Sequence, residues 1–309
     1  MKPFDVVGLG YSAVDYLGIV PRYPCLDEKM LITEFAKQGG GLTATAMVTV
    51  TRLGGRASYI GKVGGDDFGR FIIEELEKDS VDTGRVVVDP SVTSQFAFIA
   101  IDQATGKRTI FWTQSGVMLH PEEIKKGDIL AGKVLHVDSH YPKAALQAVT
   151  WANEAGIPVV MDAGTMREGS IEIAERTDAL ITSTLYARQF TGQDDPEKAA
   201  QMMFNERRLV SGVTLGDQGC VYVTKDGAFH QPAFEVDVVD TTGAGDVFHG
   251  AISFGLAKGW PVPRIMEFAA AVAAIKCTKL GGRAGIPSHT EAVAFLRARS
   301  SNRVWQDVR

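Results

Sequence analysis

The chain has 309 residues, of which 45% are hydrophobic and 22% charged, and its formal net charge is −5 at pH 7. This composition is typical of a globular protein, and the length allows one large or two smaller domains. The acidic balance argues against nucleic acid as a partner. No apolar run reaches the ~20 residues of a membrane-spanning helix, so we expect no membrane partner.

Three widely spaced cysteines, Cys25, Cys220 and Cys277, form no Cys-x-x-Cys pair. That spacing suits a reducing compartment and argues against a disulfide framework or a zinc site. The N-terminus lacks the basic region and apolar core of a signal peptide. We therefore predict a cytoplasmic protein.

Residues 4–10 predict a buried strand that ends in Gly-x-Gly, and Asp15 follows soon after it, where a turn residue is one of two interpretations. The third glycine and the amphipathic helix of a dinucleotide-binding fold are missing, which disfavours a nicotinamide oxidoreductase. Residues 16–37 contain two prolines and an alternating run around Met30. This pattern predicts β structure outside the main sheet.

A glycine-rich stretch, residues 38–41, precedes a predicted helix that ends near Gly54. Glycines before a helix offer backbone N–H groups to a ligand. Residues 58–69 predict a strand and a glycine turn that lead into a second helix, residues 70–79. An aspartate in this turn, Asp66 or Asp67, either caps the helix or contacts a ligand, and the sequence leaves both readings open.

Residues 95–102 and 108–112 predict two strands joined by a hairpin. With residues 30–35 they are expected to form a small sheet packed across the substrate site. Trp112, at the end of the second strand, either faces the substrate or fills the core of the hairpin.

Beyond the hairpin, strands and helices alternate, which predicts a mainly parallel sheet with helices on both faces. In such sheets ligands bind beyond the carboxyl ends of the strands. Asp162, Thr182 and Thr214 lie at such ends. His136 and His140 lack the partner spacing of a triad or a metal site, so we assign them structural or lid-facing positions.

Residues 236–250 carry the clearest chemistry: a strand-like β-branched run, a small-residue turn and an apolar helical segment. The turn leaves backbone N–H groups unpaired at a helix start, and Gly243 and Gly245 let a phosphate approach the backbone closely. Asp246 follows in the first helical turn. An isolated Gly-x-Gly with a capping Asp is more often a plain turn. An anion-binding turn beside a carboxylate is, however, what phosphoryl transfer to an alcohol requires. Gly243, Ala244 and Gly245 would hold the phosphoryl group, and Asp246 would accept the hydroxyl proton.

The string Asp-Thr-Thr-Gly-Ala-Gly-Asp-x-Phe at residues 240–248 closely resembles the C-terminal signature of the ribokinase family, the PfkB-type carbohydrate kinases. Three earlier stretches resemble other family elements in family order. They are residues 38–55 (the N-terminal signature), 64–69 (Gly-x-Asp-x-x-Gly) and 214–220 (the nucleotide-side turn Thr-x-Gly-x-x-Gly).

This resemblance spans nearly the whole chain and implies its organisation. We expect a single ribokinase-like α/β domain over residues 1–309, with a mainly parallel sheet and helices on both faces. Residues 16–37 and 95–113 are expected to form a small β lid inserted in it. Family members often dimerise through this lid, so we also expect a homodimer.

The resemblance further implies an ATP-dependent sugar kinase that uses Mg²⁺ and transfers the γ-phosphoryl group of ATP to a sugar hydroxyl. The residues expected at the sugar are Asp15, Gly40, Gly41, Thr45 and Lys29. Those expected at the nucleotide are Thr214, Gly216, Gly219, Thr242 and Gly282. A monovalent cation, K⁺, is expected at Asp240 and Thr242, with the loop of residues 281–285 beside it.

Two departures from the family pattern affect the substrate and the metal. Thr45 stands where most members have Asn, a feature shared with the sulfofructose-kinase branch, and the chain most resembles ketohexose-directed members. Lys29 is the candidate partner for a sulfonate. Residues 183–186 replace the usual Asn-x-x-Glu, whose Glu helps to order magnesium-bound water.

A nucleoside kinase of the same family, or a sugar-binding protein that has lost turnover, remains an alternative.

Overall fold

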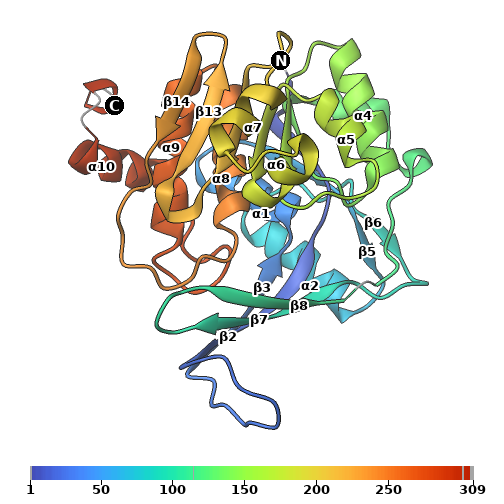
Figure 1. The fold of residues 1–309 in the computed structure, drawn as a ribbon. Helices are drawn as coiled ribbons and strands as arrows, with labels where there is room; N and C mark the ends of the chain where they lie inside the picture. Colours follow the sequence, from blue (N-terminus) through green and yellow to red (C-terminus); the bar gives the residue numbers. More distant parts are fainter. Residues whose placement is uncertain (1, 114, 301–302, 307–309) are drawn as a thin grey trace.

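The computed structural model describes residues 2–113, 115–300 and 303–306. A central eight-stranded sheet runs in the order β14-β13-β12-β11-β10-β9-β1-β4 (Figure 1). Its strands are β1 (Phe4–Leu9), β4 (Ala57–Ile60), β9 (Gly132–Val137), β10 (Val159–Ala163), β11 (Ala179–Ser183), β12 (Val210–Thr214), β13 (Cys220–Thr224) and β14 (Gly227–Gln231). Only the two pairings of β13, with β12 and with β14, are antiparallel, so the predicted mainly parallel sheet is confirmed.

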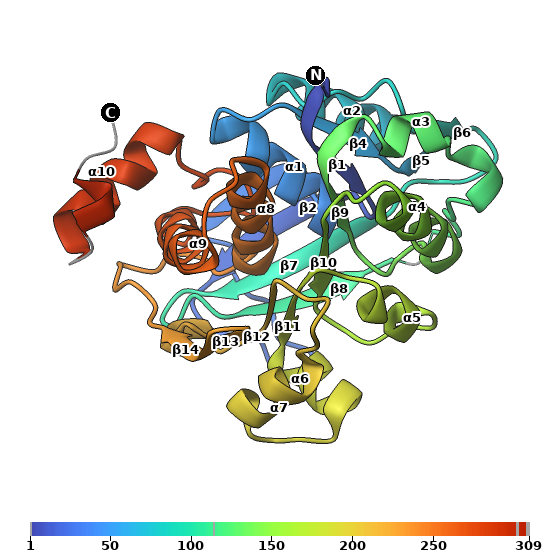
Figure 2. The same cartoon turned by 90° about the horizontal axis from the view of Figure 1, so that it is seen from above.

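Helices cover both faces of this sheet, because its strands are apolar on both sides. Val6 and Val7, neighbours in β1, are both fully buried but belong to two different core clusters. One face packs on α1 (Leu42–Arg52), α8 (Ala244–Ala257), α9 (Val262–Lys276) and α10 (His289–Arg299). The other packs on α3 (Lys126–Ile129), α4 (Pro142–Glu154), α5 (Ser170–Glu175), α6 (Thr184–Thr191) and α7 (Pro196–Met203) (Figure 2).

A second, four-stranded sheet, called the small sheet below, crosses one end of the body (Figure 1). Its order is β3 (Glu34–Gly40), β2 (Ala13–Val20), β7 (Phe96–Asp102), β8 (Arg108–Trp112). Residues 21–33 between β2 and β3 form a loop that projects away from the body and carries Cys25, which is exposed. Whether the small sheet acts as a lid stays a prediction.

Three local expectations are corrected. Strand β3 starts at Glu34 and not at Met30 as expected, because its pairing with β2 runs from Ile19↔Glu34 to Ala13↔Gly40. Asp15 therefore lies within a strand and not in a turn. Residues 236–239 do not form a strand: the Val239 N–H donates to Cys277 O (2.9 Å), after α9, instead of to a neighbouring strand.

The glycine turn after β4 leads through β5 (Lys62–Gly64) to α2 (Asp67–Lys78), and β5 pairs with β6 (Val87–Asp89). The Asp66 carboxylate caps α2 by accepting hydrogen bonds from Gly69 N–H (2.9 Å) and from Ser94 Oγ (2.7 Å). Of the two readings that the sequence left open, the structure thus supports the cap.

Among the described residues, no helix combines the length and the apolar character needed to cross a membrane.

Candidate active site

A large cavity of about 1730 Å³ lies where the carboxyl ends of the central strands meet the small sheet. Asp162 and Thr214 line it from the ends of β10 and β12, and Ile99 and Trp112 line it from the small sheet. Trp112 thus faces the cavity and does not fill the core of the hairpin. Ligands are expected at this end of an α/β sheet.

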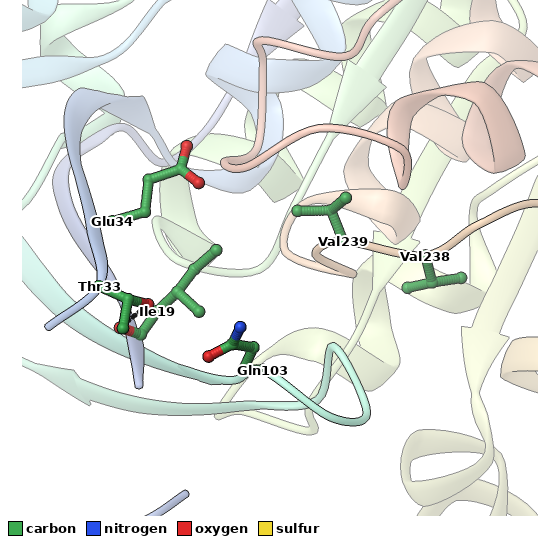
Figure 3. Close-up of a pocket in the computed structure, with 6 residues that line it drawn as sticks. All are labelled: Ile19, Thr33, Glu34, Gln103, Val238 and Val239. Carbon is green, nitrogen blue, oxygen red and sulfur yellow. Dashed lines mark hydrogen bonds between the residues drawn. The ribbon is translucent and has the colours of Figure 1, made fainter. Parts of the chain in front are cut away.

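A smaller cavity of about 370 Å³ lies between the small sheet and residues 238–239. Figure 3 shows the six side chains around it: Ile19, Thr33, Glu34, Gln103, Val238 and Val239. The two valines also line the large cavity. The small sheet therefore does not seal against the body along its whole length.

Residues 241–245, called the anion turn below, lead into α8 at the floor of the large cavity. Gly243 is the N-cap with φ of 74°, and a Cβ there would lie 2.8 Å from Gly282 Cα, so only glycine fits. Ala244 N–H donates to Thr241 O at 3.2 Å. The N–H groups of Gly245 and Asp246 follow at the helix start, where no preceding turn offers acceptors. This geometry suits an anion.

Asp246 lines the cavity from the first turn of α8. Burial, and secondly the nearby Asp162 carboxylate, raise the pKa of Asp246 to about 7, while Arg108 and His249 lower it. A carboxylate with a pKa near neutrality is suited to act as a general base.

The neighbouring Asp162 is 4% exposed, and its Oδ2 has no hydrogen-bond partner within the described structure. Burial raises the pKa of Asp162, and the His249 ring, whose Nδ1 lies 3.4 Å from Oδ2, lowers it. His249 also bonds through Nδ1 to Gly245 O (2.8 Å) and through Nε2 to Ile181 O (2.9 Å). Both acceptors are carbonyl oxygens, so a neutral ring donates to only one of them at a time. The His249 ring thus lies beside the Asp162 carboxylate and contacts the backbone of the anion turn.

The sequence analysis missed His249. A signal was available: His249 follows Asp246 by three positions, so the two side chains share one face of the helix.

Asp15 lines the cavity from β2. Burial raises the pKa of this carboxyl group to about 6, against the lowering effect of Arg283. A Cβ at Gly40 would overlap the Asp15 carboxylate, and one at Gly41 (φ 90°) would lie 2.7 Å from Tyr11 O. The two glycines therefore allow the 38–41 backbone to pass close behind Asp15 and Tyr11, and of the two only Gly41 lines the cavity.

Thr45 is buried in α1, and the structure turns it toward Arg283 rather than toward the cavity. Arg283, which the sequence analysis did not single out, is 3% exposed and donates to Thr45 Oγ1 (3.3 Å) and Gly40 O (2.9 Å). Lys29 is exposed in the projecting 21–33 loop and does not line the cavity. The structure thus brings Asp15 and Gly41 together at the cavity and leaves Thr45 and Lys29 outside it.

Aromatic and basic side chains also line the end of the cavity that contains Asp15 and Gly41. Tyr11 stacks on His140 with ring centroids 4.2 Å apart, and the Arg167 guanidinium lies 5.9 Å from the Trp112 ring centroid. All four line the cavity. His140 thus lines the cavity, whereas His136 is fully buried and its Nδ1 lies 2.9 Å from Ser253 Oγ.

The opposite end of the cavity is narrow and largely apolar. Thr214, Gly216 and Gly219 line it, as expected for the nucleotide side. Alanines of α9 and the 233–239 segment, none of them predicted, add the apolar wall: Ala270, Ala273, Ala274, Phe234 and Val236. Such a wall suits a planar base, while the anion turn lies between the two ends.

Asp240 and Gly282 lie behind the anion turn and do not line the cavity, whereas Thr242 is part of the turn and does. The Asp240 carboxylate accepts from Thr242 N–H (2.8 Å) and Gly281 N–H (2.7 Å), and the Asp240 carbonyl accepts from the Lys276 ammonium (2.8 Å). The carbonyl oxygen expected to bind K⁺ therefore already contacts a cation of the protein itself.

Residues 4–289 match the model of the pfkB family carbohydrate kinase. A probable fructokinase-2 of Arabidopsis thaliana is 31% identical over 290 residues, covering 85% of this chain and 88% of the relative. The crystal structure of an Agrobacterium tumefaciens protein with the provisional name ribokinase is 28% identical, with a TM-score of 0.90 and coverage of 96% and 98%. An Escherichia coli protein provisionally named ribokinase II, in complex with ATP and Mg²⁺, is 24% identical, with a TM-score of 0.83 and coverage of 96% and 100%, and shows the shared fold.

Proposed function

Because this chain belongs to the pfkB family of carbohydrate kinases, it is an ATP-dependent sugar phosphotransferase, and we propose that its acceptor is a ketohexose such as fructose or sulfofructose. Relatives named as fructokinases, about 30% identical over most of their length, support a ketohexose. The observation that carries the proposal is the placement of Asp246 beside the anion turn, in one cavity that Asp15 and Thr214 also line.

In the proposed reaction the sugar occupies the end with Asp15 and Gly41, and ATP occupies the end with Thr214 and Gly219. The sugar oxygen attacks the γ-phosphorus, the bond from that phosphorus to the β–γ bridging oxygen breaks, and ADP leaves with the electron pair. Asp246 takes the hydroxyl proton. The N–H groups of the anion turn stabilise the charge on the transferred group.

The small sheet already contacts the anion turn. Arg108 of β8 donates to Thr241 Oγ1 at 3.0 Å, and Gly106 O accepts from the same hydroxyl at 3.2 Å. A cation is thus held at the anion turn by the small sheet. We propose that Arg108 adds its charge to the phosphate site, and that sugar binding draws the small sheet closer to exclude water.

The residues of this site suggest how magnesium would be held. No cluster of three or more His, Cys, Asp or Glu side chains that could hold a metal occurs in the described part of the chain. Where the family usually has Asn-x-x-Glu, Ser183 caps α6 and donates to Gly164 O (2.7 Å). The Asp162 Oδ2, buried and without a partner, is suited to bind a magnesium-bound water. The ion would neutralise phosphate charge, held mainly by ATP oxygens and water.

A homodimer is part of the proposal. Ile110 and Trp112 face the cavity, so Phe111 between them points to the outer face of the small sheet, beside Phe98 of β7 (ring centroids 6.4 Å apart). Phe111 and Phe35 are 51% and 56% exposed on this face. A second copy of the chain would cover these rings.

A substrate panel tests the proposed function. The purified protein is incubated with Mg·ATP and fructose, sulfofructose, fructose phosphates, ribose or adenosine, and kcat/KM for ADP formation is compared, with NMR of the product to locate the phosphate. The proposal expects the highest value with a ketohexose. A preference for adenosine would replace it with a nucleoside kinase. Melting-temperature shifts with sugar but no ADP formation would replace it with a binding protein.

A further inference from the structure

Lys276, the last residue of α9, is a lysine with no solvent-exposed surface. Its ammonium donates a hydrogen bond to Asp240 O at 2.8 Å. A lysine ammonium is strongly hydrated in water, so complete burial is unfavourable unless charges and acceptors compensate it. The fold therefore keeps a positive charge at this place for a reason other than packing.

The surroundings of Lys276 supply that compensation. Asp240 is also fully buried, and its carboxylate is fixed by the N–H groups of Thr242 and Gly281. The ammonium lies at the C-terminus of α9, the negative end of the helix dipole. Burial lowers the pKa of Lys276, and Asp240, as the next largest influence, raises it. A second bond, Asp240 N–H to Cys277 O (3.2 Å), joins the same two segments.

This buried pair lies directly behind the anion turn. Residues 241–246 line the large cavity, whereas Asp240 and Lys276 do not. The turn is supported on the same side by the loop after α9, where Gly243 packs on Gly282 backbone to backbone. A displacement of Asp240 would therefore carry the N–H groups of the turn with it.

Potassium does not fit this arrangement. A monovalent cation supporting the turn from behind would use the Asp240 carbonyl oxygen, which the ammonium already occupies. Two cations sharing one buried oxygen would repel each other strongly, because little water is present to screen them.

We propose that the Lys276 ammonium replaces the monovalent cation, acting as a positioning residue that holds the anion turn in its phosphate-binding shape and makes turnover independent of potassium. The inference rests on the proposed kinase function. It predicts that a neutral side chain at 276 lowers kcat while the KM for the sugar changes little, because the sugar end of the cavity is separate.

The wild-type protein gives the first test. Its kcat is measured with Mg·ATP and the best sugar of the panel in choline, sodium, potassium and ammonium chloride at equal ionic strength. Equal values in all four salts are expected. Saturable activation of the wild type by potassium would overturn the proposal.

Variants give the second test. Lys276→Met keeps the length of the side chain without its charge, and Lys276→Ala leaves room for an ion. We expect kcat of both to fall by ~10²-fold, as when one oxyanion donor is lost. For Lys276→Ala, potassium or ammonium, but not choline, should restore part of kcat and raise the melting temperature. Lys279→Ala, an exposed lysine three residues further on, is the matched control and should behave as wild type.

A folded Lys276→Met protein with wild-type kcat would contradict the proposal. If neither variant folds, the salt series on the wild type still decides the question. If no sugar supports ADP formation in any salt, the proposed function fails instead. The ion-dependent melting of Lys276→Ala needs no turnover and would then test the cation site by itself.

Discussion

At the scale of single residues, the proposed chemistry depends most on Asp246. Asp246→Asn preserves the shape of the side chain but removes the charge that accepts the proton. We expect kcat to fall by roughly 10²–10⁴-fold, with sugar and ATP affinities little changed because the anion turn and Asp15 remain. Steady-state kinetics and a melting curve measure both effects. Asp226→Asn, in an exposed turn, is the control. A stable Asp246→Asn protein with near wild-type kcat would show that Asp246 only caps α8.

The raised pKa of Asp246 predicts a pH dependence. The base must be deprotonated to accept a proton, so kcat/KM should rise as the pH increases through about 7. Asp162→Asn removes the negative charge that raises this pKa, so the acidic limb of the profile should move to lower pH. The plateau should fall separately as magnesium binding weakens. An acidic limb that stays in place or moves to higher pH would disprove the coupling between the two carboxylates.

The residues that sequence reasoning found and missed differ in a physical way. Asp246 and Gly243 were predictable because their roles follow from local backbone geometry at a helix start. Arg283 and Lys276 were not, because each acts on a residue far away in the chain: Arg283 on Gly40 and Lys276 on Asp240. Such contacts exist only once the helices have packed.

At the scale of elements, closure of the small sheet has a direct readout. Addition of sugar should slow backbone hydrogen exchange in residues 16–37 and 95–112, because closure would fill the small cavity in Figure 3 and tighten the contacts around Arg108. Peptides from α4, on the far face of the central sheet, serve as the internal control. Unchanged exchange in both segments of the small sheet would contradict closure.

The outer face of the small sheet gives a second prediction at this scale. Phe111→Glu places a charge on the face proposed to meet a second copy, so the variant should be monomeric in light scattering at a concentration where the wild type is dimeric. Val88→Glu alters a side chain of equal exposure in β6 and should leave the dimer intact. A monomeric wild type, or a dimeric Phe111→Glu variant, would argue against this interface.

The elements themselves were predicted unevenly. The strands and helices of the main body follow from apolar runs and their spacing, which the fold buries on both faces of the sheet. The small sheet was harder, because residues 30–33 have the alternation of a strand but lie outside the strand pairing, with only Thr33 bonded to Ile19 O, while Gln38 and Gly40 become strand residues through pairing with β2. Three of residues 236–239 are β-branched valines, yet the Val239 N–H donates to Cys277 O after α9 and not to a strand.

At the scale of the whole molecule, the proposed site of phosphoryl transfer lies where parts distant in sequence meet. The anion turn receives Arg108 from the small sheet, Gly282 from the loop after α9 and Asp162 from the central sheet. The family resemblance anticipated this assembly at the level of the fold. The arrangement of side chains within it, with the Lys276 ammonium behind the turn and the His249 ring beside it, required the packed structure.

The exposed Cys25 in the projecting loop is a natural site for chemical labelling of the protein. Cys220 and Cys277 are buried, so a maleimide dye added to the native protein should attach at one position only. Mass spectrometry after digestion would verify the site. A fluorophore there sits between β2 and β3, so its emission would follow the motion of the small sheet in real time without any engineered residue. In a dimer formed through that sheet, mixed donor and acceptor labelling would also report exchange of subunits.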